Sequence, residues 1–280
     1  MSKLWLGTRE LFSGQLLNYV DESIYDSMDN EKLNMLVECT LPILGFLPRQ
    51  IPDYTDHGPL HANRVMYKCL DLILQAVSPA VLSPHMVFLL CASAWVHDIG
   101  NIIDRENHRH HSARLVERLW KEHYFIMLSE RETTAISQVI EMHDTNDPLD
   151  QLETDYVLEP GTPEVNLQLL AALLRLADAC DIDNRRAPAM IFQLVKEKLP
   201  ESSKLHWIAH QNVEMCRYYL DIQMIKAKVR DIEKAKVATD IVEQRYGSVA
   251  DVFKRLNVRV RGFTIETISF PELIMEEDEA

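Results

Sequence analysis

The chain has 280 residues, 47% of them hydrophobic, which is enough for one large domain, or a domain with an appendage, around a sizeable core. Its 43 acidic and 29 basic residues give a net charge of -14 at pH 7. That charge argues against a general partner of nucleic acids or membrane surfaces, but it permits a locally basic pocket. Five scattered cysteines without a C-x-x-C pair, no evident signal peptide and no bilayer-length apolar run predict a cytoplasmic protein.

Two stretches in the first third of the chain predict helices. An apolar stripe follows Ser27, but Pro42 lies inside it and Pro48 comes soon after. We therefore expect that helix to kink or split at Pro42 and the chain to break from Pro48 onward. A second helix begins near Pro59 and turns His61 inward with its apolar face. Taken alone, His61 is typical of a core histidine with a local hydrogen bond.

Residues 86 to 100 are apolar on nearly all sides, which is typical of a buried helix, and the run ends in His97-Asp98. An unpaired carboxylate at the end of a buried helix is costly. Metal coordination by the pair would explain it, whereas Asp98 alone could simply cap the following segment.

Two later segments supply histidines on inward helix faces. The residues from His108 to His111 begin a helix in which His108 shares the apolar face and His111 lies beside it; a polar loop with a helix cap is the alternative. A capping box at Ser129 starts a helix that ends with His143 on its core face. The helix dipole alone would also favour a histidine there.

A long acidic loop, residues 144–163, precedes a helix that carries the most apolar stripe of the chain. We expect this helix to start at residues 162–164, and it carries Asp178 on its buried stripe. A carboxylate in such a stripe needs a cation or another partner. The alternative is a buried salt bridge to Arg175 or Arg64.

After about residue 205 the apolar period changes from helical to alternating. The apolar residues alternate as in strands over residues 213–220, 222–229 and 258–268. Residues 231–247 predict a helix. We therefore expect a mainly α fold, with a helical domain over residues 1–204 and a small α+β appendage over residues 205–280. The appendage shows no catalytic cluster of its own.

The inward histidines and carboxylates all lie near helix ends, where a helical bundle can bring them together. Imidazole and carboxylate ligands suit Zn, Fe or Mn without selecting sharply among them. Two such metals close together can clamp a phosphoryl oxygen, and a carboxylate such as Asp98 suits a bridge between them.

The ordered set His61, His97-Asp98 and Asp178 resembles the H...HD...D signature of the HD superfamily of metal-dependent phosphohydrolases. The similarity extends to His61-Ala-Asn-Arg-Val, Trp95-Val-His-Asp-Ile-Gly, His108-x-x-x-Ser112-Ala113 and Leu174-Arg-Leu-Ala-Asp178. Tyr54-Thr-Asp-His-Gly-x-x-His and the ending Arg-Leu-Ala-Asp-x-x-Asp-Ile are most similar to the HD-CE type of domain. The resemblance covers about residues 50–190, and we expect the strands after Trp207 to belong to the same type.

The resemblance implies an HD-domain helical bundle that binds one or two divalent metals, which would be Mn, Fe, Zn or Mg. The first metal would be held by His61, His97, Asp98 and Asp178. His108 and His143 would hold the second with Asp98 as the bridge, and His111 remains the alternative to His108.

The implied activity is hydrolysis by a metal-activated water, with His97 and Asp98 as the catalytic pair. The substrate would be a phosphomonoester or phosphodiester of a nucleotide or another small phosphorylated compound. The candidate phosphate partners are Arg64, Arg175, Arg185 and Arg186. Structural ion pairs are the alternative for Arg64 and Arg175.

Other readings of the chain remain open. A cyclic-di-GMP hydrolase is disfavoured, because Asn101 follows His97-Asp-Ile-Gly and no GYP sequence is present. A non-catalytic metal- or nucleotide-binding sensor or adaptor with an HD fold is the main alternative. A structural protein whose histidines and aspartates are satisfied in its core is the other. We expect no membrane or nucleic-acid partner, and the sequence leaves a homo-oligomer open.

Overall fold

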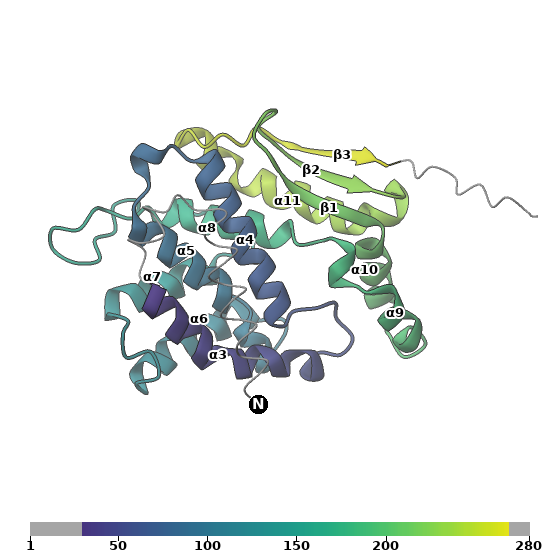
Figure 1. Cartoon of the computed structure of the whole chain (residues 1–280), viewed down its shortest axis with the longest axis horizontal. Helices are drawn as coiled ribbons and strands as arrows, with labels where there is room; N and C mark the ends of the chain where they lie inside the picture. The colour runs from purple at the N-terminus through teal and green to yellow at the C-terminus, as the bar shows by residue number, and fades with distance from the viewer. Residues whose placement is uncertain (1–29, 269–280) are drawn as a thin grey trace, which may run out of the picture.

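The computed structural model describes residues 30–268, so the expectations for residues 1–29 and 269–280 lie outside the described residues. Figure 1 shows a helical bundle on one side and a small sheet with helix α11 on the other. The bundle contains α3 (Asn30–Gln50), α4 (Pro59–Ala76), α5 (Pro84–Val96), α6 (His108–Lys121), α7 (Glu130–Glu141) and α8 (Leu167–Ala179). Short 3-10 turns follow α4, α5 and α8, namely η1 (Pro79–Val81), η2 (Ile99–Ile102) and η3 (Asn184–Arg186).

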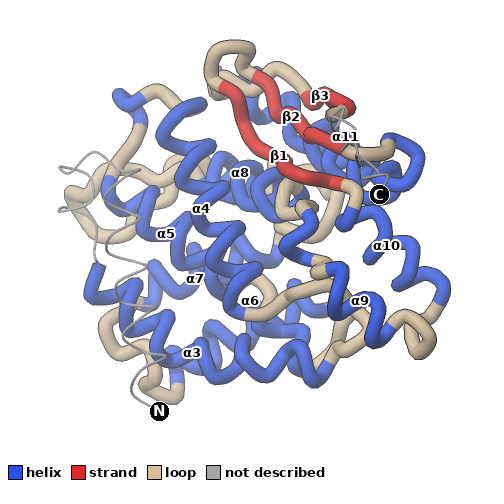
Figure 2. Tube along the Cα trace, turned by 45° about the vertical axis from the view of Figure 1, so that its right-hand side comes forward, coloured by secondary structure: helices blue, strands red, loops and turns tan. Residues whose placement is uncertain are grey.

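The rest of the described chain forms the α+β part. It contains α9 (Ala189–Val195), α10 (Glu201–Gln211), β1 (Val213–Tyr219), β2 (Met224–Val229), α11 (Ile232–Arg255) and β3 (Phe263–Thr267). Strand β1 pairs antiparallel with β2, and β2 pairs parallel with β3, with α11 as the crossover between them. Figure 2 shows the three strands together on one side of the molecule. The expected fold class, mainly α with a small α+β part near the C-terminus, is confirmed.

Helix α5 lies at the centre of the bundle and is buried on every side. The side chain of Ser83 accepts a hydrogen bond from the backbone amide of Met86 and so caps the helix. Pro84 takes the first helical position, where the backbone amide would have no acceptor within the helix and its absence costs no hydrogen bond. Every residue from Met86 to Val96 is buried. The helix therefore ends at His97 inside the protein, and a polar pair at that point must find its partners there.

Two expected helix boundaries are wrong. Helix α3 continues through Pro42 and Pro48 to Gln50, because its apolar face stays buried on both sides of the first proline. A proline removes one hydrogen bond of a helix, and continuous packing on the core can offset that loss. Helix α8 begins at Leu167 with Asn166 as its cap, not at residues 162–164.

The helical and α+β parts share one hydrophobic core. Cys216 and Ile225 from the strands belong to the same buried cluster as Leu70 of α4 and Leu174 of α8. The expected boundary at residue 204 falls inside α10. A smaller cluster under α9 stacks Phe192 on Trp207. The sheet and α10 are thus packed on the bundle and can contribute to a site that the bundle forms.

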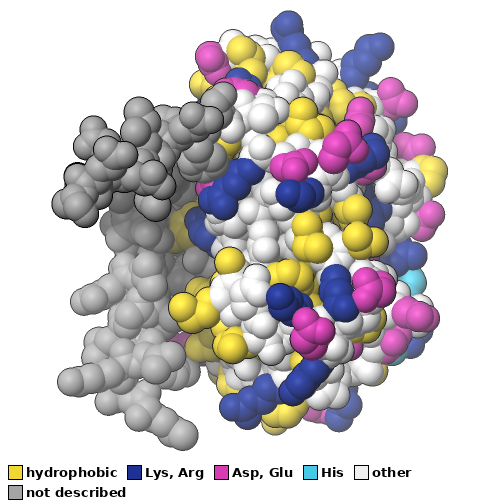
Figure 3. All heavy atoms as spheres, turned by 90° about the vertical axis from the view of Figure 1, so that its right-hand side faces the viewer, with side chains coloured by type: hydrophobic (Ala, Val, Ile, Leu, Met, Phe, Trp, Pro, Cys, Tyr) yellow, Lys and Arg dark blue, Asp and Glu magenta, His cyan; other side chains and the backbone are white. Residues whose placement is uncertain are grey.

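No helix within residues 30–268 combines the length and the apolar character needed to cross a bilayer. Figure 3 shows the side of the molecule that lies to the right in Figure 1, where acidic and basic side chains are interspersed. The described part of that face therefore lacks the continuous basic surface that binding to a nucleic-acid backbone requires.

Candidate metal centre

His61 enters the centre of the protein from the first turn of α4. Gly58 caps that helix, its backbone amide donates to Asp56 Oδ1 at 2.9 Å, and Pro59 occupies the first helical position. His61 has no exposed surface, and its ring faces the end of α5. The core histidine expected from the sequence is therefore also a member of the candidate site.

His97 and Asp98 lie where α5 passes into η2. Asn101 of η2 donates from its side chain to Asp98 Oδ1 at 2.8 Å, which fixes the orientation of that carboxylate. Gly100 lies directly against the start of α6, where an added Cβ would come within 2.1 Å of the backbone oxygen of His108. This close approach requires glycine and sets His108 beside Asp98.

The structure distinguishes among the clustered histidines of α6. His108 is buried, and its Nε2 lies 3.4 Å from Asp98 Oδ1. His111 instead faces Asp104 at 3.9 Å near the surface, and His110 pairs with Glu141 at 2.7 Å. The alternative left open by the sequence is therefore decided geometrically in favour of His108.

His143 and Asp178 complete the cluster from two further helices. His143 follows the end of α7, and its Nε2 lies 3.1 Å from Nε2 of His108. Asp178 is in the last turn of α8, where its side chain is 22% exposed to the adjoining cavity. Arg175, one turn earlier, donates two hydrogen bonds to the carbonyl of Met142 and so fixes the chain next to His143.

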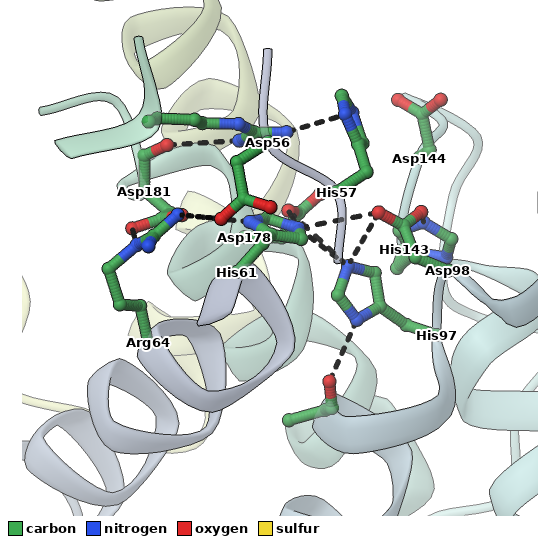
Figure 4. Close-up of polar contacts among 12 residues, drawn as sticks. Asp56, His57, His61, Arg64, His97, Asp98, His143, Asp144, Asp178 and Asp181 are labelled. Carbon is green, nitrogen blue, oxygen red and sulfur yellow. Dashed lines mark hydrogen bonds and ion pairs between the residues drawn. The ribbon is translucent and has the colours of Figure 1, made fainter. Parts of the chain in front are cut away.

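The first half of the centre consists of His61, His97 and Asp178 (Figure 4). The Nε2 atoms of the two histidines are 3.2 Å apart, and Asp178 Oδ1 lies 3.3 Å from the first and 3.5 Å from the second. Asp98 Oδ2 lies 3.4 Å from Nε2 of His61 and 3.6 Å from Nε2 of His97.

The second half of the centre consists of His108 and His143. Both Nε2 atoms face Asp98 Oδ1, at 3.4 Å and 3.9 Å. Asp144 adds a second carboxylate, with Oδ2 3.6 Å from Nε2 of His108, and Arg245 of α11 binds its other oxygen. The two oxygens of Asp98 therefore point at two different histidine pairs.

The hydrogen bonds behind the rings determine where their lone pairs lie. The Nδ1 atoms of His97, His108 and His143 lie 2.6 to 2.8 Å from the backbone carbonyls of Ala94, Arg105 and Ile140. Nδ1 of His61 lies 2.8 Å from a carboxylate oxygen of Asp181. Because each acceptor requires the proton on Nδ1, the lone pairs of all four Nε2 atoms point into the centre.

This donor set fits divalent metal ions. Two neutral Nε2 lone pairs near 3 Å repel each other unless a proton or a cation lies between them, and metal–nitrogen bonds of about 2.1 Å place adjacent ligands at about that separation. The imidazole and carboxylate atoms form three overlapping groups in which all potential ligand atoms lie within 4.8 Å of one another. Residues 30–268 thus contain a buried cluster that can hold metal.

Without a metal, protons compensate part of the negative charge. Burial lowers the pKa of His61, but the hydrogen bonds that its ring donates to Asp178, Asp181 and Asp98 outweigh burial and raise the pKa to about 10. Burial raises the pKa of Asp98, but His97 and His61 hold that pKa well below its ordinary value. In the second half, burial and the neighbouring His97 keep the pKa of His143 well below its ordinary value, so that ring stays neutral.

Asp181 is a member of the site that the sequence did not single out. Its carboxylate is fully buried, accepts from His61 Nδ1, and accepts from Arg64 Nε at 2.9 Å. Arg64 also donates to Asp56 at 3.1 Å (Figure 4). Asp181 therefore orients His61 and makes it a better ligand, and its position three residues after Asp178 was the available signal.

Three of the four expected phosphate partners are held elsewhere. Arg64 pairs with Asp181 and Asp56, which agrees with the ion-pair alternative. Arg175 is buried, donates to the carbonyls of Met142 and Asp147, and is not among the residues that line the cavity beside the centre. Arg185 is largely exposed and pairs with Asp183.

A cavity of about 320 Å³ adjoins the cluster. Asp98, His108 and Asp178 form one part of its wall, and Arg186 is the one expected arginine that lines it. The sequence also missed most of the remaining wall, which comes from the loop before α4, from Arg105, and from α10. The hydrophobic periodicity of the sequence does not predict that these residues lie beside the metal centre.

Comparison with known proteins agrees with this arrangement of helices and ligands. The model of the HD-CE family matches residues 51–256, which is most of the chain and includes the α+β part as far as the end of α11. A protein of Methanocaldococcus jannaschii named Uncharacterized protein MJ1020 is 26% identical over 143 residues, covering 45% of this chain and 53% of the relative. This chain thus spans about half the length of that relative.

The fold and the site together define a helical protein with a histidine–aspartate centre of HD type. The chain belongs to the HD-CE family, and the resemblance seen in the sequence motifs is confirmed. The expectation that the strands after Trp207 belong to the same type is confirmed for β1 and β2, because the family match continues to residue 256; β3 lies beyond it.

Proposed function

We propose that this protein is a metal-dependent phosphohydrolase that acts on a nucleotide or another small phosphate ester and binds two divalent ions. The observation that carries the proposal is the position of Asp98, whose two oxygens face two separate pairs of Nε2 atoms. A shared carboxylate between two ligand sets is the arrangement that a pair of metal ions requires.

The residues of the chain divide the tasks of such a reaction. His61, His97 and Asp178 would hold one ion, His108 and His143 the other, and Asp98 would bridge them. When bound, the ions would supply positive charge to the phosphoryl oxygens and lower the pKa of a water. Asn101 keeps Asp98 in the bridging orientation through its hydrogen bond to Oδ1.

The cavity gives a small substrate access to this centre. The partly exposed side chains of Asp178 and Asp144 face it, so a phosphate group can reach the metals from that side. His57 lines the same wall, but burial and the adjacent Arg186 keep its pKa well below its ordinary value. His57 would therefore act as a neutral hydrogen-bonding group and would not supply a proton to the leaving group.

A phosphate-release screen over nucleotides and small phosphate esters, with added Mn, tests the proposal. The expected result is release from at least one compound and its loss in Asp98→Asn, while Asp104→Asn, a matched change at an exposed carboxylate, keeps the activity. A non-catalytic sensor would bind metal and release no phosphate from any compound. A structural protein would bind no metal at all.

A further inference from the structure

The wall of the cavity has an acidic side and a basic side. Asp98, Asp144 and Asp178 face it from the metal centre. Arg105, from the loop between η2 and α6, and Arg186, from η3, also line it. Two ions at the centre would compensate the acidic side, whereas the two arginines need a different counter-charge.

Arg186 is held in the wall by neutral groups. Its guanidinium donates to the carbonyl of Asp181 and to Nε2 of His57, both at 2.9 Å. His57 donates from Nδ1 to the carbonyl of Thr55 at 2.6 Å, so the ring that accepts from Arg186 is uncharged. The side chain of Arg186 is only 9% exposed, and its Nε has no hydrogen-bond partner among residues 30–268.

Arg105 is also without a carboxylate partner in the described part of the chain. It donates to Asn101 Oδ1 at 3.1 Å, and its guanidinium lies over the ring of Tyr54 at 5.1 Å. By contrast, Arg64 and Arg185 form ion pairs with aspartates. Both arginines that line the cavity therefore lack a carboxylate within ion-pair distance among the described residues.

Helix α10 completes the wall on the same side as the arginines. Ser202, Ser203 and His206 lie on its first two turns and face the cavity with Trp207. Burial lowers the pKa of His206, and Arg186 and Arg105 lower it further, so this neutral ring lies within the field of both cations. Hydroxyl and imidazole groups beside two guanidinium groups can donate several hydrogen bonds to one anion.

We propose that Arg105 and Arg186 form a subsite for a second phosphate group, so that the substrate class is a small compound carrying at least two phosphates. This inference rests on the proposed function, in which one phosphate binds at the metal centre. Guanidinium groups match phosphate oxygens in fork geometry, and a buried cation without a carboxylate is stabilised by an anionic ligand. In a chain with a net charge of -14, a ligand with several negative charges also needs such local compensation.

Isothermal titration of the Mn-loaded full chain with inorganic phosphate and with methylenediphosphonate, which cannot be hydrolysed, tests the subsite. We expect the wild type to bind the diphosphonate at least about tenfold more tightly than phosphate. Arg105→Gln and Arg186→Gln should each reduce that ratio about fivefold or more, since each removes charge-assisted hydrogen bonds. Arg118→Gln, a matched change at an exposed guanidinium paired with Glu122, should keep the wild-type ratio.

An unchanged ratio in Arg105→Gln, with metal content at the wild-type level, would overturn the subsite, because the preference would then come from the metal ions alone. Arg186→Gln removes two hydrogen bonds near Asp181, so it is interpreted only if its metal content is also unchanged, and otherwise Arg105→Gln decides. The outcomes for the two proposals differ. If the diphosphonate is preferred only when both arginines are present, but no compound is hydrolysed, the subsite stands and the hydrolase proposal falls. If a compound is hydrolysed but the affinity ratio is unchanged in the arginine variants, the hydrolase stands and the subsite falls.

Discussion

The two halves of the metal centre have the same number of histidines but different surroundings. In the first half, Asp178 and Asp98 face His61 and His97, and a buried third carboxylate, Asp181, holds His61 from behind. In the second half, Nδ1 of His108 and Nδ1 of His143 lie against backbone carbonyls, with Arg105 also 3.3 Å from Nδ1 of His108, and no carboxylate stands behind either ring among the described contacts. The charge that stabilises a cation is therefore concentrated in the first half.

This difference suggests that the halves bind metal unequally. The first half combines two carboxylates with a histidine made more basic by Asp181, which favours tight binding. The second half has the shared Asp98 and the partly exposed Asp144, whose other oxygen is engaged by Arg245. We expect the second ion to bind more weakly and to leave first when metal is withdrawn.

The largest effect is expected from Asp98→Asn, because this residue belongs to both halves. The neutral amide cannot bridge two cations, so metal content should fall from two ions to one or none, and phosphate release should fall by roughly 1000-fold. Metal analysis of the purified variant and a phosphate-release assay measure the two outcomes. Retention of two ions and of activity would show that Asp98 is not the bridge.

The next largest effect should distinguish the two halves of the centre, because it should remove only one of the two ions. His108→Ala should remove the second ion and leave the first, with a loss of activity of roughly 100-fold, because one of the two charges on the phosphoryl group disappears. His111→Ala is the matched control, since that ring faces Asp104 at the surface, and it should retain both ions. The comparison fails if His111→Ala loses an ion and His108→Ala does not.

Asp181→Asn should weaken only the first half. Removing the charge behind His61 makes its Nε2 a poorer ligand, and we expect the affinity for the tightly bound ion to fall by about 10- to 100-fold. Competition with a chelator of known affinity measures it, and the second ion serves as an internal control. Equal weakening at both ions would mean that Asp181 supports the fold of the whole centre and not His61 in particular.

The pH dependence of metal binding should also differ between the halves. The pKa of His61 is raised to about 10 without metal, so a proton competes with the first ion, and its affinity should rise up to about tenfold per pH unit between pH 7 and 9. The pKa of His143 is lowered, so this ring offers its lone pair throughout that range. Titration in buffers of different ionisation enthalpy should detect proton release with the first ion.

The same pKa shift affects the stability of the metal-free protein. Because the folded pKa of His61 lies above its unfolded value, its contribution is complete below about pH 6.5 and is lost as the pH rises through about 10. Denaturant unfolding of metal-free protein at pH 7 and pH 10 measures this change. A free energy of unfolding that increases towards pH 10 would contradict the proton held at His61.

Much of the centre could be predicted from helical periodicity. His61, His143 and Asp178 lie on apolar stripes that turn inward, and the apolar run before His97-Asp98 predicts a buried helix end. The family resemblance added the grouping of these residues around metal. The choice between His108 and His111 could not be made, because it depends on how closely Gly100 lets α6 approach.

The rest of the site depends on contacts between distant parts of the chain. Trp207 of α10 donates to the carbonyl of Asp53 at 3.2 Å, and this contact brings α10 to the cavity. Arg175 and Arg186 are alike in the sequence, as arginines near an apolar helix end. Their roles differ because Arg175 donates hydrogen bonds to backbone carbonyls of the loop after α7. The sequence around Arg175 contains no pattern that predicts this contact.

The central claim is that two ions lie on either side of one carboxylate. Anomalous diffraction from crystals of the Mn-loaded protein, measured above and below the Mn absorption edge, tests it most directly. We expect two peaks flanking Asp98, about 3.5 to 4 Å apart, one beside His61 and His97 and the other beside His108 and His143. A single peak outside these side chains, or no peak in a protein that releases phosphate, would contradict it.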